Sequence, residues 1–141
     1  MQLRRVKILG TGKYLPSRKV TDEELDERLG VPSGWVHKIT GVGVRHYVGE
    51  GETASYMGAR AAEAALANAG LRFSDIDCLV CTSGTKEQPL PSTAVWIQKA
   101  MGQETSGVPA FDIDATCLSF LTGLDVLSYM VDAGRYRHVL L

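Results

Sequence analysis

The sequence predicts an α/β fold with a mostly parallel sheet, and two observations support this prediction. Helical and strand-like hydrophobic patterns alternate along the chain, as they do in proteins whose parallel strands are connected by helices. One strand signal, at residues 76–82, is apolar almost throughout, which is typical of a parallel strand buried on both faces. The 141 residues have the length of a single domain.

The first third of the chain is predicted to contain a strand and two short helices. Residues 5–12 have the pattern of a strand, which a Gly-Thr-Gly run ends. Residues 21–29 begin with a Thr-Asp-Glu-Glu capping box, so we expect them to form a helix. Ser33 is expected to cap a second short helix that carries Trp35. The Gly-rich residues 40–47 are expected to form a loop with extended parts.

The remainder of the chain alternates longer helices with strands. The expected helices are residues 53–70, 91–102 and 117–133, and the expected strands are residues 76–82, 108–113 and 138–141. Thr53 has the position of an N-cap, and Gly70 has that of a C-terminal stop. Because the sequence ends inside an apolar strand signal, we expect a longer protein or a partner to complete the sheet.

Composition restricts the class of protein. Hydrophobic residues make up 45%, charged residues 22%, and the net charge is -1, which argues against a nucleic-acid partner. No apolar run approaches the roughly 20 residues that span a bilayer, and no signal-peptide pattern follows the charged start. Three cysteines are too few for a disulfide framework. We therefore expect a cytoplasmic protein that binds neither nucleic acid nor membranes.

Cys117 is the clearest candidate for chemistry. It comes shortly after the strand predicted at residues 108–113 and opens the next helix. Unpaired backbone N–H groups and the helix dipole favour a thiolate at such a position, and the same groups could hold a thioester oxyanion. The alternative is that Cys117 is a small buried hydrophobic residue, since cysteine is among the most buried residue types.

Cys78 and Cys81 form a Cys-x-x-Cys pattern, which is also found in redox and metal sites. Here both lie within a predicted strand, where side chains three residues apart point to opposite faces. They therefore cannot share a metal ion or form a disulfide without a bulge, and we expect no metal site. The spacing of His37, His46 and His138 identifies none of them as the base that a catalytic thiol needs.

Short motifs along nearly the whole chain share the order and spacing of one enzyme family. They are residues 8–16, 34–35, 40–46, 52–53, 57–59, 91–92 and 111–120. Together they resemble the N-terminal half of ketoacyl-acyl-carrier-protein synthase III. The resemblance implies that residues 1–141 are the first half of a thiolase-like fold, a layered α-β-α arrangement with a mixed, mostly parallel sheet. The C-terminal half would lie outside this sequence.

The resemblance also implies a ping-pong reaction. Cys117 would accept an acyl group from acyl-CoA, and malonyl-acyl-carrier protein would lose carbon dioxide and attack the thioester, in fatty acid or related biosynthesis. The histidine and asparagine that assist decarboxylation in such enzymes belong to the second half. The implied partners are acyl-CoA, acyl carrier protein and a second copy in a homodimer. No cofactor is implied, because the CoA thioester is a substrate.

Two further site residues follow from the resemblance. Trp35 matches the tryptophan that stacks on the CoA adenine, and Leu90 matches a bulky residue with which the partner subunit closes the acyl pocket. Ile39 stands where several relatives carry an arginine that meets the CoA phosphates. Thr116 and Leu118-Ser119 differ from the Ala-Cys-Ala-Gly run of housekeeping enzymes, which implies a specialised relative.

Two alternatives stay open at this point. One is another thiolase-superfamily condensing enzyme, of the olefin or quinolone type. The olefin type is disfavoured because such enzymes have a glutamate at the position of Leu90, and leucine cannot act as a base. The other alternative is a non-catalytic half that only dimerises or binds a carrier protein.

Overall fold

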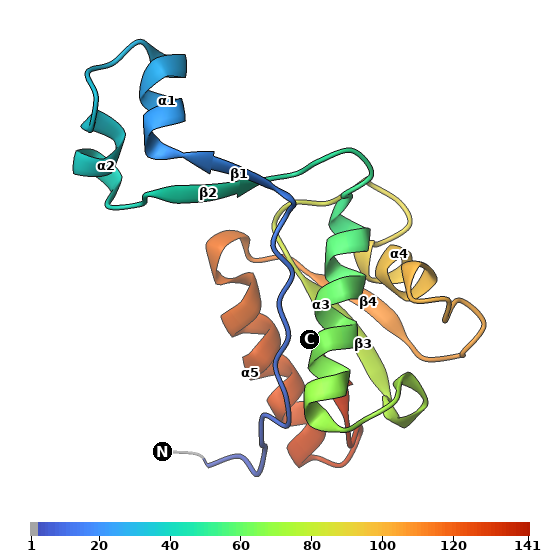
Figure 1. The fold of residues 1–141 in the computed structure, drawn as a ribbon. Coiled ribbons are helices and arrows are strands. Elements are labelled where there is room, and N and C mark those ends of the chain that lie inside the picture. Colours follow the sequence, from blue (N-terminus) through green and yellow to red (C-terminus); the bar gives the residue numbers. More distant parts are fainter. Residues whose placement is uncertain (1–2) are drawn as a thin grey trace. The chain divides into compact units, whose positions relative to one another are not determined.

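The computed structural model describes residues 3–141 and divides into two compact units, most of whose elements are labelled in Figure 1. The smaller unit is Leu15–Glu52. The larger unit combines the N-terminal segment up to Tyr14 with Thr53–Leu141. Among the described residues, no helix is long and apolar enough to cross a membrane.

The smaller unit pairs two antiparallel strands that two short helices separate in sequence. Its elements are β1 (Arg18–Thr21), α1 (Asp22–Leu29), α2 (Trp35–Thr40) and β2 (Val44–Tyr47). Thr21 caps α1 as predicted, because its hydroxyl accepts a hydrogen bond from the backbone N–H of Glu24 at 3.2 Å. β2 supplies the extended part predicted for residues 40–47, whereas β1 has no counterpart among the predicted strands.

The prediction that Ser33 caps α2 is wrong. The N-cap is Gly34, and the N–H groups at the start of α2 are satisfied from α1 instead. The Asp26 carboxylate accepts hydrogen bonds from the N–H of Gly34 at 2.6 Å and from that of Val36 at 2.8 Å. A buried carboxylate facing two unpaired donors replaces the local hydroxyl, because charge-assisted hydrogen bonds are stronger than neutral ones.

The larger unit is a three-stranded parallel sheet with helices on both faces. Its elements are α3 (Ala54–Ala69), β3 (Cys78–Thr82), α4 (Thr93–Ala100), β4 (Ala110–Ile113), α5 (Ser119–Asp132) and β5 (Val139–Leu140), with short 3-10 turns at Phe73–Asp75 and Thr116–Leu118. The strand order is β4-β3-β5, and both pairs are parallel. The sequence predicted each of these strands and longer helices near its observed place.

Two apolar clusters place the helices on opposite faces of this sheet. Leu79 of β3 packs with residues of α3 and α4, whereas its neighbours Cys78 and Val80 pack with Leu127 of α5. Successive strand residues point to opposite faces, so α5 covers one face and α3 with α4 the other (Figure 1). This is the layered α-β-α arrangement that the resemblance implied.

A carboxylate also joins the sheet to α4. Asp112 of β4 accepts hydrogen bonds from the backbone N–H groups of Thr93 and Ala94, each at 2.8 Å. Ser92 is the N-cap residue of α4, but its side chain makes no capping hydrogen bond. The strand therefore supplies the cap of the helix that precedes it in sequence.

Residues 5–12 do not form the predicted strand. None of the described strands pairs with them, and the segment packs against α3. A Cβ atom at Gly12 would collide with the carbonyl oxygen of Ala61, and the N–H of Thr11 donates to the Asn68 side chain at 3.0 Å. The pattern misleads because an extended segment packed on a helix can have strand-like alternation without a ladder partner.

Candidate active site

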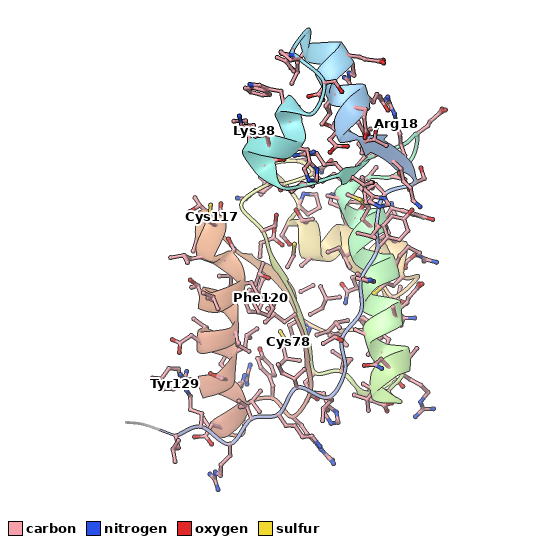
Figure 2. The ribbon with its side chains drawn as sticks, turned by 60° about the vertical axis from the view of Figure 1, so that its left-hand side comes forward. Arg18, Lys38, Cys78, Cys117, Phe120 and Tyr129 are labelled. Carbon is pink, nitrogen blue, oxygen red and sulfur yellow. The ribbon has the colours of Figure 1, made fainter. Side chains whose placement is uncertain are left out.

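Cys117 lies at the carboxyl end of the parallel sheet, between β4 and α5. β4 ends at Ile113, a 3-10 turn covers Thr116–Leu118, and α5 begins at Ser119. The Cys117 side chain is exposed, and Figure 2 shows it at the end of α5 where the helix begins. The carboxyl ends of parallel strands are where α/β proteins commonly bind ligands. The predicted strand-to-helix position of Cys117 is confirmed, and its role as nucleophile stays a prediction.

The turn before Cys117 has an unusual backbone. Thr116 has a φ of 51°, in the left-handed region that β-branched residues rarely adopt. Its N–H donates to Asp114 Oδ1 at 3.0 Å, and its hydroxyl donates to the carbonyl oxygen of Ala115 at 2.8 Å. Ser119 Oγ accepts from the N–H of Ala115 at 2.9 Å and donates to the carbonyl oxygen of Thr116 at 2.7 Å. These bonds fix the turn that presents the thiol.

The loop after β3 lies beside this turn. Thr82 pairs with Ile113, so the carboxyl ends of β3 and β4 meet at one edge of the sheet. A Cβ atom at Gly84 would lie 3.2 Å from Cα of Thr116 and 3.4 Å from Asp114 Oδ1. Glycine at this position lets the two loops approach each other closely.

Cys78 and Cys81 lie on opposite faces of β3, as predicted. Cys78 is completely buried in the cluster that faces α5, and Cys81 packs against the cluster that faces α3 and α4. Burial raises the pKa of the Cys78 thiol, and burial with the nearby charge of Asp112 raises the pKa of Cys81 to about 11. Both residues therefore remain thiols near neutral pH. Nowhere in residues 3–141 do three His, Cys, Asp or Glu side chains gather as a metal site would require.

His138 belongs to the same unit as Cys117 but lies at the other end of the sheet. It directly precedes β5, which runs parallel to β3, and its Nδ1 donates to the carbonyl oxygen of Asp75 at 2.8 Å. Cys117 follows the carboxyl end of β4, whereas His138 stands at the amino end of β5. His138 is therefore not placed to act as a base for Cys117.

Leu90 lies in the loop between β3 and α4, and 82% of its surface is exposed. Glu87 of the same loop accepts a hydrogen bond from the N–H of Ser55 at 2.7 Å, in the first turn of α3. The amide of Gln88 donates to the carbonyl oxygen of Leu90. The loop is thus tethered to a helix N-terminus while its apolar side chain stays accessible. Sequence reasoning missed Glu87, because the contact joins residues 32 positions apart.

Trp35 is the first residue of α2, in the smaller unit, and is 43% exposed. A partly exposed indole can stack on a planar ring, so the exposure of Trp35 is compatible with the predicted adenine contact. On the same helix, His37 Nδ1 lies 2.7 Å from the Asp22 carboxylate. The hydrogen bond with Glu23, and then that with His37, lower the pKa of Asp22. His46 is engaged elsewhere, with its Nδ1 donating to the carbonyl oxygen of Pro16 at 2.6 Å.

Known proteins match this chain along nearly its whole length. The family model described as 3-Oxoacyl-[acyl-carrier-protein (ACP)] synthase III matches residues 111–141. The Beta-ketoacyl-[acyl-carrier-protein] synthase III of Rhodospirillum rubrum is 41% identical over 133 residues, which cover 94% of this chain and 41% of the relative. That of Acidiphilium cryptum is 41% identical over 138 residues, which cover 98% and 42%. The chain therefore spans about two fifths of the length of these curated relatives.

Solved structures give the same result. The 3-oxoacyl-[acyl-carrier-protein] synthase III from Aquifex aeolicus VF5 matches with a TM-score of 0.83 and 34% identity, over 92% of this chain and 41% of that one. A variant of Xanthomonas campestris OleA matches with a TM-score of 0.83 and 26% identity, over 94% and 41%. In sequence and in fold, the chain resembles the N-terminal half of beta-ketoacyl-[acyl-carrier-protein] synthase III, and its fold is that of the first half of a thiolase-like protein.

Proposed function

We propose that the protein is an acyltransferase of the ketoacyl-acyl-carrier-protein synthase III type, with Cys117 as its nucleophile. The Cys117 thiolate attacks the carbonyl carbon of an acyl-CoA, and CoA leaves as its thiolate and takes up a proton. Malonyl-acyl-carrier protein then loses carbon dioxide, and the electron pair of the broken C–C bond attacks the acyl carbonyl. The bond to Sγ breaks, which regenerates the Cys117 thiolate and releases a ketoacyl-carrier protein.

The observation that carries this proposal is the presentation of Cys117, in a chain that matches such synthases over 94–98% of its length. The thiol is exposed at a strand end, next to the first turn of α5. The N–H groups of Leu118 and Ser119 already donate to the carbonyl oxygens of Ala115 and Thr116. The positive end of the α5 dipole is therefore what favours a thiolate at this position. Leu118, Phe120 and Leu121 beside it are all more than half exposed, which suits contact with an acyl chain.

The remaining roles extend this proposal to the rest of the reaction. Trp35 stacks on the CoA adenine, and Leu90 reaches the acyl pocket of the partner in a cytoplasmic homodimer that accepts acyl carrier protein. The chain itself spans about two fifths of its relatives. The resemblance implies that a histidine and an asparagine outside this sequence assist the decarboxylation. Preorganised donors of that kind contribute on the order of 3 kcal/mol each.

The olefin type is the second candidate, because OleA is among the similar solved structures. Its identity is 26%, against 34% for the Aquifex synthase. Leu90 also lacks the carboxylate expected of that type. An olefin-type enzyme would condense two acyl groups supplied by acyl-CoA, whereas a non-catalytic half would form no acyl-enzyme.

Intact-mass spectrometry of the protein expressed from its complete reading frame tests the proposal. After incubation with a panel of acyl-CoAs, the protein should gain the mass of one acyl group. Cys117→Ala should abolish this gain, and Cys81→Ala, the matched cysteine control, should preserve it. An acylated Cys117→Ala protein would mean that another residue is the nucleophile.

The second step separates the candidates. The acyl-enzyme should yield a ketoacyl product with malonyl-acyl-carrier protein, whereas product formed only with a second acyl-CoA would favour the olefin type. Residues 1–141 alone should yield no ketoacyl product. Steady turnover by that piece would show that the decarboxylation site lies within this sequence.

A further inference from the structure

We propose that Ser119 is a positioning residue for Cys117, because its hydroxyl holds Thr116 in the left-handed conformation that orients the thiol. The inference rests on the proposed function, in that Cys117 is taken as the nucleophile. Ser119 itself does not contact the reacting atoms. It acts two residues away, through the backbone on the N-terminal side of the cysteine.

The hydroxyl of Ser119 makes one hydrogen bond on each side of the Ala115–Thr116 peptide bond. It accepts the N–H of Ala115 at 2.9 Å and donates to the carbonyl oxygen of Thr116 at 2.7 Å. The backbone N–H of Ser119 also donates to the carbonyl oxygen of Thr116. One side chain therefore fixes the groups before and after the Ala115–Thr116 peptide, and with them the direction in which the chain enters Cys117.

The turn needs this support because Thr116 is unsuited to its own conformation. A φ of 51° places a β-branched side chain in a region that glycine, asparagine or aspartate adopts more readily. Without outside bonds the turn would relax toward negative φ, and the Cys117 Sγ would move relative to the first turn of α5. Such strain persists only where surrounding structure enforces it, and it is concentrated at functional sites.

The burial of Ser119 shows that its hydroxyl acts within the turn. The residue is 3% exposed, whereas Thr116, Cys117 and Leu118 are all exposed. With both of its hydrogen bonds directed at the turn, the hydroxyl is not available to a substrate. Its removal should therefore change the orientation of the thiol and leave the affinity for acyl-CoA unaltered.

The test is a double-mutant cycle in the complete protein. Ser119→Ala removes the hydroxyl, and Thr116→Gly removes the conformational strain, since glycine populates positive φ readily. Acylation of Cys117 is followed as kcat and KM with acyl-CoA. Alkylation of Cys117 by iodoacetamide at a fixed pH gives a second rate that needs no substrate.

Ser119→Ala should lower both the acylation kcat and the alkylation rate by roughly tenfold, with KM unchanged, as expected for the loss of a buried hydrogen-bonded clamp. In the Thr116→Gly background the same change should cost only about twofold. The conservative Ser119→Thr variant, which keeps the hydroxyl, should retain the alkylation rate.

Three results would overturn the proposal. One is an unchanged rate in Ser119→Ala, and another is an equal loss in both backgrounds. The third is unfolding of Ser119→Ala in both backgrounds, because the hydroxyl would then hold the fold and not the thiol. The proposed function fails separately: if the wild type forms no acyl-enzyme while the alkylation rates follow the expected pattern, the positioning role stands and the acyl transfer does not.

Discussion

The same residue type occurs in two opposite environments in this protein. Cys117 lies on an exposed turn that side-chain hydrogen bonds hold in place, whereas Cys78 and Cys81 lie in β3, the central strand of the sheet. Burial raises the pKa of both strand cysteines. Backbone placement, and not the Cys-x-x-Cys motif, therefore decides which thiol can react. A turn between strand and helix exposes a thiol at the positive end of the helix dipole, whereas a strand interior removes it from water.

The largest expected effect is a difference in labelling between these cysteines. Iodoacetamide at pH 7.5 should alkylate Cys117 at least a hundredfold faster than Cys78 or Cys81 in the folded protein. With its pKa at about 11, only roughly one Cys81 thiol in three thousand is ionised at that pH, and the thiolate is the reactive form. Peptide mass spectrometry measures the three rates. Equal labelling of the three cysteines in the folded protein would contradict the difference between their environments. In urea, where the protein is unfolded, the three rates should be equal, which serves as the control.

The second expected effect concerns the contact between α5, the helix after Cys117, and β3, the strand that holds Cys78 and Cys81. A Cβ atom at Gly123 of α5 would collide with the Thr82 methyl group of β3 and lie 3.1 Å from Leu141 Cδ1. Gly123→Ala should lower the free energy of unfolding by about 1–2 kcal/mol, because overpacking outweighs the better helix propensity of alanine. Urea unfolding gives the value.

A second substitution identifies the cause of that loss. Thr82→Ser removes the methyl group from the contact, so it should recover most of the stability in the Gly123→Ala background. If Gly123→Ala is as stable as the wild type, the helix can move away from the strand at little cost. The two regions would then be less tightly coupled than the structure indicates.

The smallest expected effect is a difference in stability loss between substitutions at the two ends of the sheet. The Asp77 carboxylate, directly before β3, accepts the N–H groups of Arg137 at 2.7 Å and His138 at 2.9 Å. Asp77→Ala should lower stability by on the order of 1 kcal/mol at pH 7, since the residue is exposed. Asp114→Ala, at the carboxyl end, should cost less, because its carboxylate accepts the N–H of Thr116 within a local turn.

The pH dependence of the Asp77 effect has a defined sign. The hydrogen bonds to His138 and Arg137 hold the pKa of Asp77 below its ordinary 3.8. The carboxylate therefore stabilises the folded state fully at neutral pH, and this contribution is lost as the pH falls below 3.8 through the folded-state pKa. The stability difference between wild type and Asp77→Ala should be constant at neutral pH and shrink in acid. A difference that grows in acid would contradict the assignment.

The sequence predicted the parts of the fold whose signals are local. The cap at Thr21, the stop at Gly70 and the apolar strand at residues 76–82 depend on neighbouring residues, and all three are confirmed. Residues 5–12 were predicted wrongly because the same alternation suits a strand and a segment packed on a helix. Ser33 was predicted wrongly because the cap of α2 comes from Asp26, in another helix.

In the candidate site, too, local sequence signals predicted some features and missed others. The place of Cys117 between strand and helix was predictable from its neighbours, and the opposite orientations of Cys78 and Cys81 followed from strand geometry. The role of Ser119 was not predictable. Its two hydrogen bonds depend on a backbone conformation of Thr116 that no sequence pattern indicates.

The Asp112 carboxylate, which caps α4 from within β4, has a consequence for local opening of the protein. The amide hydrogens of Thr93 and Ala94 belong to the first turn of a helix, where exchange with solvent is usually fast because those groups lack partners. Here both are bonded to a strand of the sheet. They should exchange with deuterium only when β4 opens, so the start of α4 and the strand should behave as one cooperative unit in native-state hydrogen exchange.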